Sequence, residues 1–138
     1  MSIKVLLDTS ILLTSLKLPF DLFGETEKLL QAKVEFLVPQ QVQDELQKLS
    51  KKQTSIGVRA TRALEITAKC KTVHLKSGFG TNADEALIRA SKEAKAIVAT
   101  ADSQLRMRLR ALNVPVLTLR GNRLYCEPET PEYWPSML

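Results

Sequence analysis

Short apolar runs alternate with amphipathic segments along this chain, and this alternation is what most constrains the fold. Helical periodicity of apolar residues fills the intervals, at residues 20–32, 41–52, 58–69, 83–94 and 103–112. The apolar runs predict strands at residues 3–7, 34–38, 72–75, 96–100 and 115–119. The pattern indicates an α/β protein with three α/β/α layers and a central, mainly parallel sheet of about five strands.

Turn-forming and capping residues separate these segments. Residues 8–10, Asp-Thr-Ser, suit a turn from strand to helix, because their side chains accept hydrogen bonds from exposed helix N–H groups. The Gly-rich segment at residues 77–82 predicts a loop in which Thr81 or Asn82 caps the next helix.

The C-terminal part of the chain has a different composition. Gly121 and Asn122 predict a two-residue turn into a short strand at residues 124–126. Three of the six prolines lie in the twelve residues that follow. We therefore expect a single domain over residues 1–126, followed by a Pro-rich tail at 127–138.

The composition is that of an ordinary globular protein. A length of 138 residues suits one domain, and 44% hydrophobic with 25% charged residues argues against intrinsic disorder. No apolar run approaches the roughly 18 residues of a membrane-spanning helix, and no signal peptide is recognisable. Cys70 and Cys126 are expected to be unbridged thiols in a reducing compartment. These features predict a cytoplasmic protein without a membrane partner.

Four carboxylates fall at one edge of the predicted sheet. Asp8 directly follows the first strand, and Asp102 comes two residues after the fourth. Glu45 lies in the second turn of the helix after the second strand, and Asp84 in the first turn of the helix after the Gly-rich loop. Because ligands of open α/β sheets bind beyond the carboxyl ends of the strands, these four side chains are expected to share one pocket.

Each acid also has a structural explanation. An acid in the first turn of a helix is favoured by capping and by the helix dipole, at about 0.3–1 kcal/mol. That explanation is sufficient for Asp84, and either Asp84 or Glu85 can be the residue that faces the pocket. Asp8 is the strongest candidate, because an Asp after an apolar strand packs poorly and is well placed for a ligand.

The chemistry of the four acids favours a hard metal ion. Crowded carboxylates raise one another's pKa values unless a cation lies among them, and no Lys or Arg stands beside Asp8, Glu45 or Asp84 in the sequence. An all-oxygen ligand set suits one or two Mg²⁺ or Mn²⁺ ions, which serve phosphoryl transfer. The single histidine, His74, is expected to have a surface or packing role, which disfavours zinc and a Ser-His-Asp triad.

Basic residues are concentrated in two stretches, within a formal net charge of +5. Residues 48–76 hold eight Lys and Arg against a single acid, and residues 103–125 hold five arginines and no acid. Such segregation provides a nucleic-acid backbone with a track that releases counterions on binding. Arg106 and Arg110 share a helical face, from which Arg108 points away. The candidate contacts are Lys48, Lys51, Lys52, Arg59, Arg62, Arg106, Arg110, Arg120 and Arg123.

Several short motifs, taken in order, resemble the PIN domain family. They are Asp8-Thr-Ser, Val42-Gln-Asp-Glu45-Leu, Asn82-Ala-Asp84 and Thr100-Ala-Asp102, and the resemblance covers essentially the whole chain. The segments Asp-Ser-Gln-Leu-Arg-Met-Arg-Leu-Arg at 102–110 and Val-Pro-Val-Leu-Thr-Leu-Arg-Gly at 114–121 are most similar to the archaeal and eukaryotic PIN endonucleases that process ribosomal RNA. VapC-type toxins are more distant relatives.

The resemblance implies a Mg²⁺- or Mn²⁺-dependent endoribonuclease in ribosomal RNA processing. The catalytic and metal-binding acids implied by position are Asp8, Glu45, Asp84 and Asp102. The residues that would support them by hydrogen bonding are Ser10 and Thr100. The implied partners are RNA, in particular pre-ribosomal RNA, a second copy of the chain in a homodimer, and an antitoxin or a ribosome-assembly protein.

Two departures from the family pattern leave alternatives open. The family often has Asn in place of Ser10, and Thr-Asn-Asp where this chain has Ala101 in the middle, which removes one contact at the site. The alternatives are an RNA-binding or scaffold protein with little or no catalysis, and a VapC-type toxin ribonuclease. A phospho-receiver domain is disfavoured, because Arg120 rather than a Lys follows the fifth strand.

Overall fold

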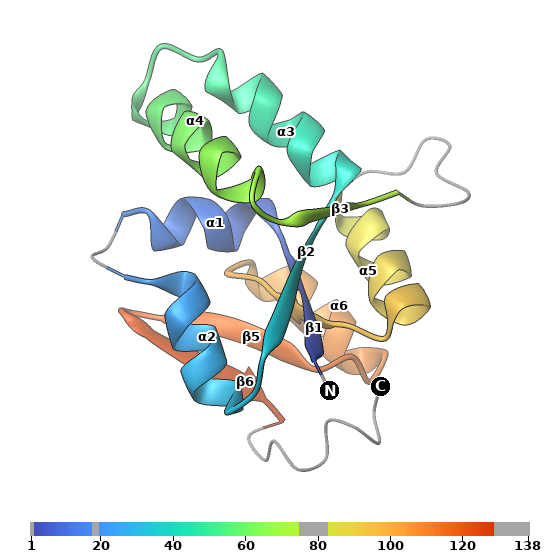
Figure 1. Cartoon of the computed structure of the whole chain (residues 1–138). Coiled ribbons are helices and arrows are strands. Elements are labelled where there is room, and N and C mark those ends of the chain that lie inside the picture. Colours follow the sequence, from blue (N-terminus) through green and yellow to red (C-terminus); the bar gives the residue numbers. More distant parts are fainter. Residues whose placement is uncertain (1, 18–19, 75–82, 129–138) are drawn as a thin grey trace.

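Six strands of the described chain form one sheet (Figure 1). The computed structural model describes residues 2–17, 20–74 and 83–128. The strands are β1 (Ile3–Leu7), β2 (Val34–Pro39), β3 (Lys71–Val73), β4 (Ile97–Ala99), β5 (Val116–Arg120) and β6 (Arg123–Glu127). The helices are α1 (Thr9–Ser15), α2 (Leu22–Leu30), α3 (Gln40–Ser50), α4 (Ser55–Thr67), α5 (Ala83–Ala94) and α6 (Ser103–Ala111).

The strand order in the sheet is β3-β2-β1-β4-β5-β6. The pairs from β3 to β5 are parallel, and β6 pairs antiparallel with β5. The predicted α/β class with a mainly parallel sheet is confirmed. The sheet has six strands rather than about five, because the short strand predicted at residues 124–126 joins it as β6.

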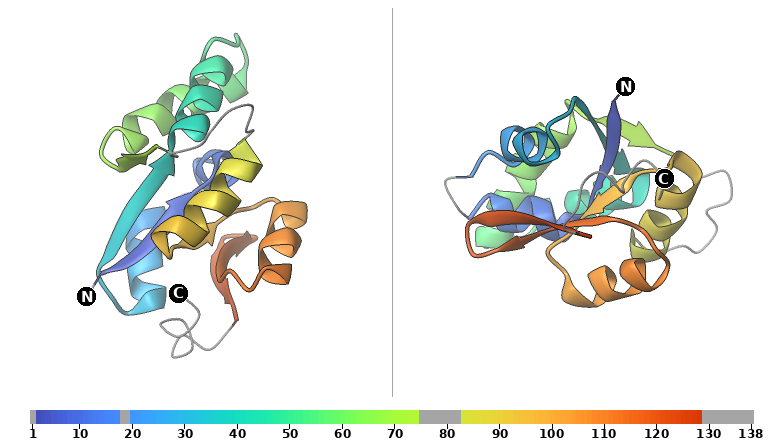
Figure 2. Two further views of the ribbon diagram at one scale, coloured as in Figure 1. Left: turned by 90° about the vertical axis from the view of Figure 1, so that its right-hand side faces the viewer. Right: turned by 90° about the horizontal axis from the view of Figure 1, so that it is seen from below.

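Helices cover both faces of the sheet and give the molecule three layers (Figures 1 and 2). Helices α1 and α2 lie on one side of the sheet, and α5 and α6 lie on the other. The neighbouring helices α3 and α4 lie beyond the carboxyl end of β2, at the top of Figure 1. The predicted α/β/α architecture is therefore confirmed.

The central strands are apolar because they are covered on both faces. Val5, Leu6 and Leu7 of β1 have no exposed surface, and the whole of β4, Ile97–Ala99, is equally buried. Consecutive buried residues are what a parallel strand between two helical layers requires. This burial explains why the first strand shows an apolar run without alternation in the sequence.

The predicted elements begin and end within two residues of their expected bounds except for α4, and α1 was predicted only as a strand-to-helix turn at residues 8–10. Helix α4 begins at Ser55, three residues before the predicted start, and includes Gly57. A Cβ at Gly57 would lie 1.8 Å from the carbonyl oxygen of Lys52. The glycine therefore marks a close approach between the end of α3 and the start of α4, rather than a break in the helix.

The β5–β6 hairpin has the predicted two-residue turn. Arg120 pairs with Arg123 across Gly121 and Asn122. Gly121 has a φ of 64°, which glycine adopts without steric cost. Glu127, expected to begin the tail, is instead the last residue of β6.

Some predictions fall outside the described residues, namely the loop at 77–82, its caps Thr81 and Asn82, and the tail beyond residue 128. Within the described part of the chain, no helix combines the length and the apolar character needed to cross a bilayer. Cys70 and Cys126 are not joined by a disulfide.

Candidate active site

The carboxyl ends of β1 and β4 lie side by side where the strand order of the sheet reverses. From β1 the chain builds the sheet through β2 and β3, and it then crosses to β4 and β5 on the other side. The N–H of Asp8 donates to the carbonyl oxygen of Ala99 at 3.2 Å, which joins the two strand ends. Such a switch point leaves a crevice in which α/β proteins bind ligands.

A pocket of about 80 Å³ at this crevice brings the four predicted acids together. Its lining residues are Asp8, Thr9, Ser10, Glu45, Ala83, Asp84, Leu87 and Asp102. Of the two adjacent acids on α5, Asp84 lines the pocket, whereas Glu85 contacts Arg108 of α6. A larger cavity of about 560 Å³ between α1, α2 and α4 is lined by none of the four acids.

Asp8 is held in place by groups from two strand ends. It is 4% exposed, and its Oδ1 caps α1 by accepting a hydrogen bond from the N–H of Ile11 at 2.8 Å. The hydroxyl of Ser10 lies 2.8 Å from both carboxylate oxygens. The hydroxyl of Thr100, just beyond β4, donates to Oδ2. Ser10 and Thr100 therefore occupy the positions expected of supporting residues.

The surroundings of Asp8 favour its neutral form. Burial raises the pKa of this carboxyl from 3.8 to about 6, although the hydrogen bonds from Thr100, Ile11 and Ser10 lower it. The charge of Asp102 raises the same pKa further. A buried carboxylate with a second acid beside it is the electrostatic setting that a bound cation relieves.

Asp102 combines a capping role with its place at the pocket. Its Oδ1 accepts hydrogen bonds from the N–H groups of Gln104 and Leu105 at 2.9 and 3.2 Å, and so caps α6. Its own N–H donates to the hydroxyl of Thr100 at 3.0 Å. The N–H of Ala101 donates to Ser10 Oγ at 2.9 Å, so residue 101 supports the site through its backbone.

Asp84 has a basic neighbour, Arg108, that lies 24 residues later in the sequence. Burial and the charge of Asp102 raise the pKa of Asp84, while the charge of Arg108 lowers it. No Lys or Arg stands beside Asp84 in the sequence, but the fold brings Arg108 of α6 close to it. Arg108 points away from Arg106 along α6, and this direction carries it toward α5. The helical spacing of the arginines indicated the direction of Arg108, but the sequence did not show that α5 lies in that direction.

Glu45 lies on α3 at the solvent-exposed side of the pocket. Its neighbour Asp44 turns elsewhere, because Asp44 Oδ1 accepts a hydrogen bond from Gln40 Nε2 at 2.9 Å along the helix. The structure thus separates two adjacent acids into one that lines the pocket and one that does not. Thr9 is a further lining residue that the predicted site lacks, and its buried hydroxyl has no partner within the described part of the chain.

The donor set of the pocket fits a hard divalent cation that keeps part of its water shell. All four acids offer oxygen, and the repulsion at Asp8 and Asp84 favours a positive charge between them. Among the described residues, no three His, Cys, Asp or Glu side chains are grouped closely enough to enclose an ion. Mg²⁺ is usually bound through one or two carboxylates with water and phosphate completing its shell, so such spacing suits it.

Helix α3, which carries the pocket residue Glu45, and its neighbour α4 both bear basic residues. Lys48 lies one turn after Glu45 on α3, so it continues the face that carries the pocket acid, and Lys52 follows just beyond the C-terminal end of the helix. The exposed basic side chains of this region are Lys48, Lys51, Lys52 and Arg62. Within the described residues these four form no ion pair, while Arg59 is half-buried with an unpartnered Nε. Their charges are therefore available to an anionic ligand.

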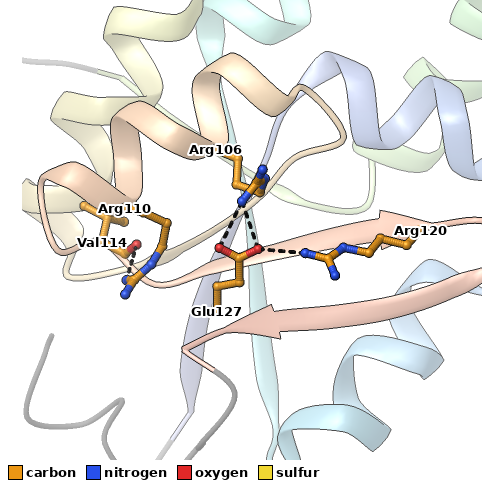
Figure 3. A network of polar contacts seen from close by, with 5 residues as sticks. All are labelled: Arg106, Arg110, Val114, Arg120 and Glu127. Atoms are coloured by element: carbon orange, nitrogen blue, oxygen red, sulfur yellow. Dashed lines mark hydrogen bonds and ion pairs between the residues drawn. The ribbon is translucent and has the colours of Figure 1, made fainter.

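The predicted contacts on α6 and β5 are engaged within the fold (Figure 3). Arg106 Nη1 donates to both oxygens of Glu127, at 3.0 and 3.1 Å, and Arg120 Nη2 donates to Oε1 of the same residue at 3.2 Å. Arg110 Nη1 donates to the Val114 carbonyl oxygen at 3.1 Å. The contacts of Arg106 and Arg120 with Glu127 connect α6 with the β5–β6 edge, a structural role for residues that the sequence predicts as RNA contacts.

The remaining predictions concern two surface residues. Arg123 lies with its guanidinium carbon 6.0 Å from the ring centre of Tyr125, on the exposed end of the hairpin. His74 is exposed, in agreement with the surface role expected for it. It is not among the residues that line the carboxylate pocket.

Known proteins share this fold along nearly its whole length. A PIN-like domain matches residues 5–122. Ribonuclease VapC4 of Methanocaldococcus jannaschii is 29% identical over 123 residues, which are 88% of this chain and 94% of that protein. The solved structure of the PIN domain endonuclease Utp24 has a TM-score of 0.75 and 28% identity, over 90% of both chains. A domain of a functionally unknown protein from Methanocaldococcus jannaschii shares the fold, with a TM-score of 0.64 and 18% identity over 87% of this chain and 93% of that one.

The fold and the site together define a class of three-layer α/β proteins, in which carboxylates gather where the strand order of the sheet reverses. Within this class the chain belongs to the PIN-like domain family, and the resemblance drawn from the motifs is confirmed. PIN domains are generally nucleases, and the two named relatives are a ribonuclease and an endonuclease.

Proposed function

We propose that the protein is a divalent-metal-dependent endoribonuclease that hydrolyses RNA phosphodiester bonds, with Asp8, Glu45, Asp84 and Asp102 as its catalytic acids. The observation that carries this proposal is the pocket in which all four acids meet. The family supports nuclease chemistry, and a relative named a ribonuclease supports RNA as the substrate.

The four acids would hold one or two Mg²⁺ or Mn²⁺ ions. When bound, such an ion supplies charge neutralisation at the phosphate and activation of a water molecule. Ser10 and Thr100 fix the direction of the Asp8 carboxylate through their hydroxyls. Glu45 and Asp84 accept no hydrogen bond within the described residues, so their oxygens are available to orient the attacking water and the ion's shell.

RNA would approach the pocket along α3. The exposed Lys48, on the face that carries Glu45, and the exposed Lys52, just beyond the end of α3, can neutralise the phosphates next to the cleaved bond. We place the RNA contacts on this face, with Lys51, Arg59 and Arg62 on the adjoining surface. Arg123 remains a proposed contact at the hairpin, whereas Arg106, Arg110 and Arg120 are engaged within the fold.

Pre-ribosomal RNA is the proposed substrate class, because residues 102–110 and 114–121 resemble PIN endonucleases of ribosomal RNA processing. The likeness to Utp24 supports an endonuclease of this kind. A toxin ribonuclease that pairs with an antitoxin is the second candidate, because Ribonuclease VapC4 matches 88% of the chain. We also propose that the protein forms a homodimer or, if it acts on pre-ribosomal RNA, that it binds a ribosome-assembly protein.

The test is cleavage of total RNA and of assembled pre-ribosomal RNA in Mn²⁺ and in Mg²⁺. Asp8→Asn and Asp102→Asn are the informative variants, because Asn caps helices about as well as Asp and so removes the charge while preserving α1 and α6. We expect both variants to lose cleavage. Equal cleavage by wild type and by either variant would contradict the proposed site. RNA that is bound but left uncleaved with both ions would favour the RNA-binding or scaffold alternative.

A further inference from the structure

Arg108 connects α6 to α5 at the rim of the carboxylate pocket. Its Nη2 donates a hydrogen bond to Oε1 of Glu85 at 2.6 Å. Both side chains are about half exposed, at 50% and 45%. Glu85 is adjacent in sequence to Asp84, and Asp102 caps α6, so the ion pair joins the two helices that each supply an acid to the pocket, although neither Glu85 nor Arg108 is among its lining residues.

The electrostatics agree with this placement. The charge of Arg108 acts on Asp84 and opposes the effect of Asp102 on the same carboxyl. Arg108 also has donors to spare, because within the described residues only Nη2 has a hydrogen-bond partner. A guanidinium presents five N–H donors in a planar fork that matches the oxygens of a phosphodiester.

The pair with Glu85 is suited to being exchanged. Ion pairs between half-exposed side chains contribute little to stability, so a ligand can replace Glu85 at low cost. An RNA phosphate that approaches the pocket is repelled by whatever carboxylate charge a bound ion leaves unneutralised. A cationic side chain at the rim reduces that repulsion at the point of entry.

We propose that Arg108 binds an RNA phosphate at the rim of the carboxylate pocket, and that this phosphate takes the place of Glu85 on the guanidinium. The inference rests on the proposed function, since it names a contact for the same RNA. It gives Arg108 a direct role in binding, and gives Glu85 the role of holding the side chain at the rim before RNA arrives.

Arg108→Gln is the first test, with Lys28→Gln as the matched control. Lys28 lies in an exposed ion pair with Glu25 on α2, so the control removes the same charge away from the pocket. Binding of a fluorescein-labelled single-stranded RNA of mixed sequence is measured in the Asp8→Asn background, which prevents cleavage. We expect Arg108→Gln to weaken RNA binding about tenfold and the control to leave it nearly unchanged. Equal affinities of the two variants would overturn the proposal.

Mn²⁺ affinity measured without RNA is expected to change in the opposite direction to RNA affinity. In protein with Asp8 intact, Arg108→Gln removes a positive charge beside the acids, so we expect Mn²⁺ affinity measured by calorimetry to rise at least twofold. A residue that only supported the fold would weaken both ligands together. Loss of Mn²⁺ affinity in Arg108→Gln would therefore contradict the placement at the rim.

Two further variants distinguish a direct contact between Arg108 and RNA from a general electrostatic effect of its charge. Arg108→Lys keeps the charge but loses the fork, so we expect RNA binding to remain several-fold weakened, and full recovery would overturn direct contact. Glu85→Gln removes the charge of the competing acceptor and weakens its bond to Arg108, so we expect tighter RNA binding that disappears in the double variant with Arg108→Gln. A gain that persists in the double variant would show that Glu85 acts by charge alone, which contradicts the exchange.

The outcomes distinguish this inference from the proposed function. If no RNA is cleaved but Arg108→Gln still weakens RNA binding, the rim contact stands and the catalytic proposal fails. If cleavage depends on Asp8 and the Arg108 variants bind RNA like the control, the catalytic proposal stands and the rim contact fails.

Discussion

The hydroxyl of Thr100 donates a hydrogen bond to the carboxylate of Asp8, which lies 92 residues earlier in the chain. The bond joins the ends of β4 and β1, the two strands between which the order of the sheet reverses. Thr100 also accepts the N–H of Asp102 at 3.0 Å. One buried hydroxyl therefore positions two of the four pocket acids, and its loss is expected to affect both stability and ionisation.

We expect Thr100→Val, which preserves shape and removes the hydroxyl, to lower the free energy of unfolding by about 1–3 kcal/mol. The N–H of Asp102 loses its acceptor, and Asp8 loses a bond that lowers its pKa. The pKa of Asp8 should consequently rise above its value of about 6. Urea unfolding and an NMR titration of the carboxyl measure the two effects, with Thr118→Val on β5 as a control. An unchanged pKa would contradict the role given to Thr100.

Asp8→Asn is expected to stabilise the protein when divalent cations are absent. The folded-state pKa of about 6 lies above the ordinary value of 3.8, so folding favours the protonated carboxyl. The corresponding stability is present below about pH 4 and is lost as the pH rises through about 6. At neutral pH the ionised carboxylate thus costs up to about 3 kcal/mol, which the uncharged amide avoids.

Thermal unfolding across this pH range tests that expectation. The melting temperature of Asp8→Asn should exceed that of wild type at neutral pH, and the difference should shrink toward pH 4. Added Mn²⁺ should raise the melting temperature of wild type more than that of the variant. A variant that melts below wild type at neutral pH without divalent ions would show that burial of the charge is not the dominant effect.

The sequence was sufficient to place the acids but not their neighbours. Asp8 and Asp102 were predictable because parallel strands put their carboxyl ends at one edge, whatever the details of packing. The choice between Asp84 and Glu85 depended on the rotation of α5 about its axis, and Glu85 is drawn to Arg108 of another helix. Side-chain periodicity fixes directions on one helix, and it contains no information on which element the helix faces.

The arginines of α6 show the same limit more clearly. Arg106 was expected to bind an anionic ligand, since residues 103–125 hold five arginines and no acid. Its partner Glu127 lies 21 residues later and belongs to β6, a strand expected to end before that residue. The pairing of Arg106 with Glu127 depends on how β6 joins the sheet, which the sequence does not show. The surplus of positive charge on α6 is therefore smaller than the composition implies.

Glu45→Gln is expected to reduce RNA cleavage at least tenfold, while Asp44→Asn is expected to leave it nearly unchanged. The two acids are adjacent on α3, but Glu45 lines the pocket and Asp44 accepts a hydrogen bond from Gln40. Because both variants remove one negative charge from the same helix, the comparison isolates position. Cleavage rates at saturating Mn²⁺ measure the difference, and equal loss in both variants would refute the pocket as the catalytic site.

Glu127→Gln is expected to lower the free energy of unfolding by about 1–2 kcal/mol. It weakens the charged hydrogen bonds from Arg106 and Arg120 that connect α6 with the β5–β6 edge. Glu25→Gln is the control, because its ion pair with Lys28 is exposed and should contribute under about 0.5 kcal/mol. Urea unfolding compares the two, and equal effects would contradict a structural role for the Glu127 contacts.

The face of α3 predicts how RNA binding depends on salt. Lys48 lies on the side of α3 that carries Glu45, Lys52 lies just beyond the end of the helix, and neither forms an ion pair within the described residues. In the Asp8→Asn background, we expect Lys48→Gln with Lys52→Gln to reduce the slope of log affinity against log salt by about 1.4 for single-stranded RNA. The double control Lys28→Gln with Lys92→Gln makes the same charge change on α2 and α5. Fluorescence anisotropy over a salt series measures the slopes, and an equal reduction in the control would mean that RNA responds to net charge rather than to this face.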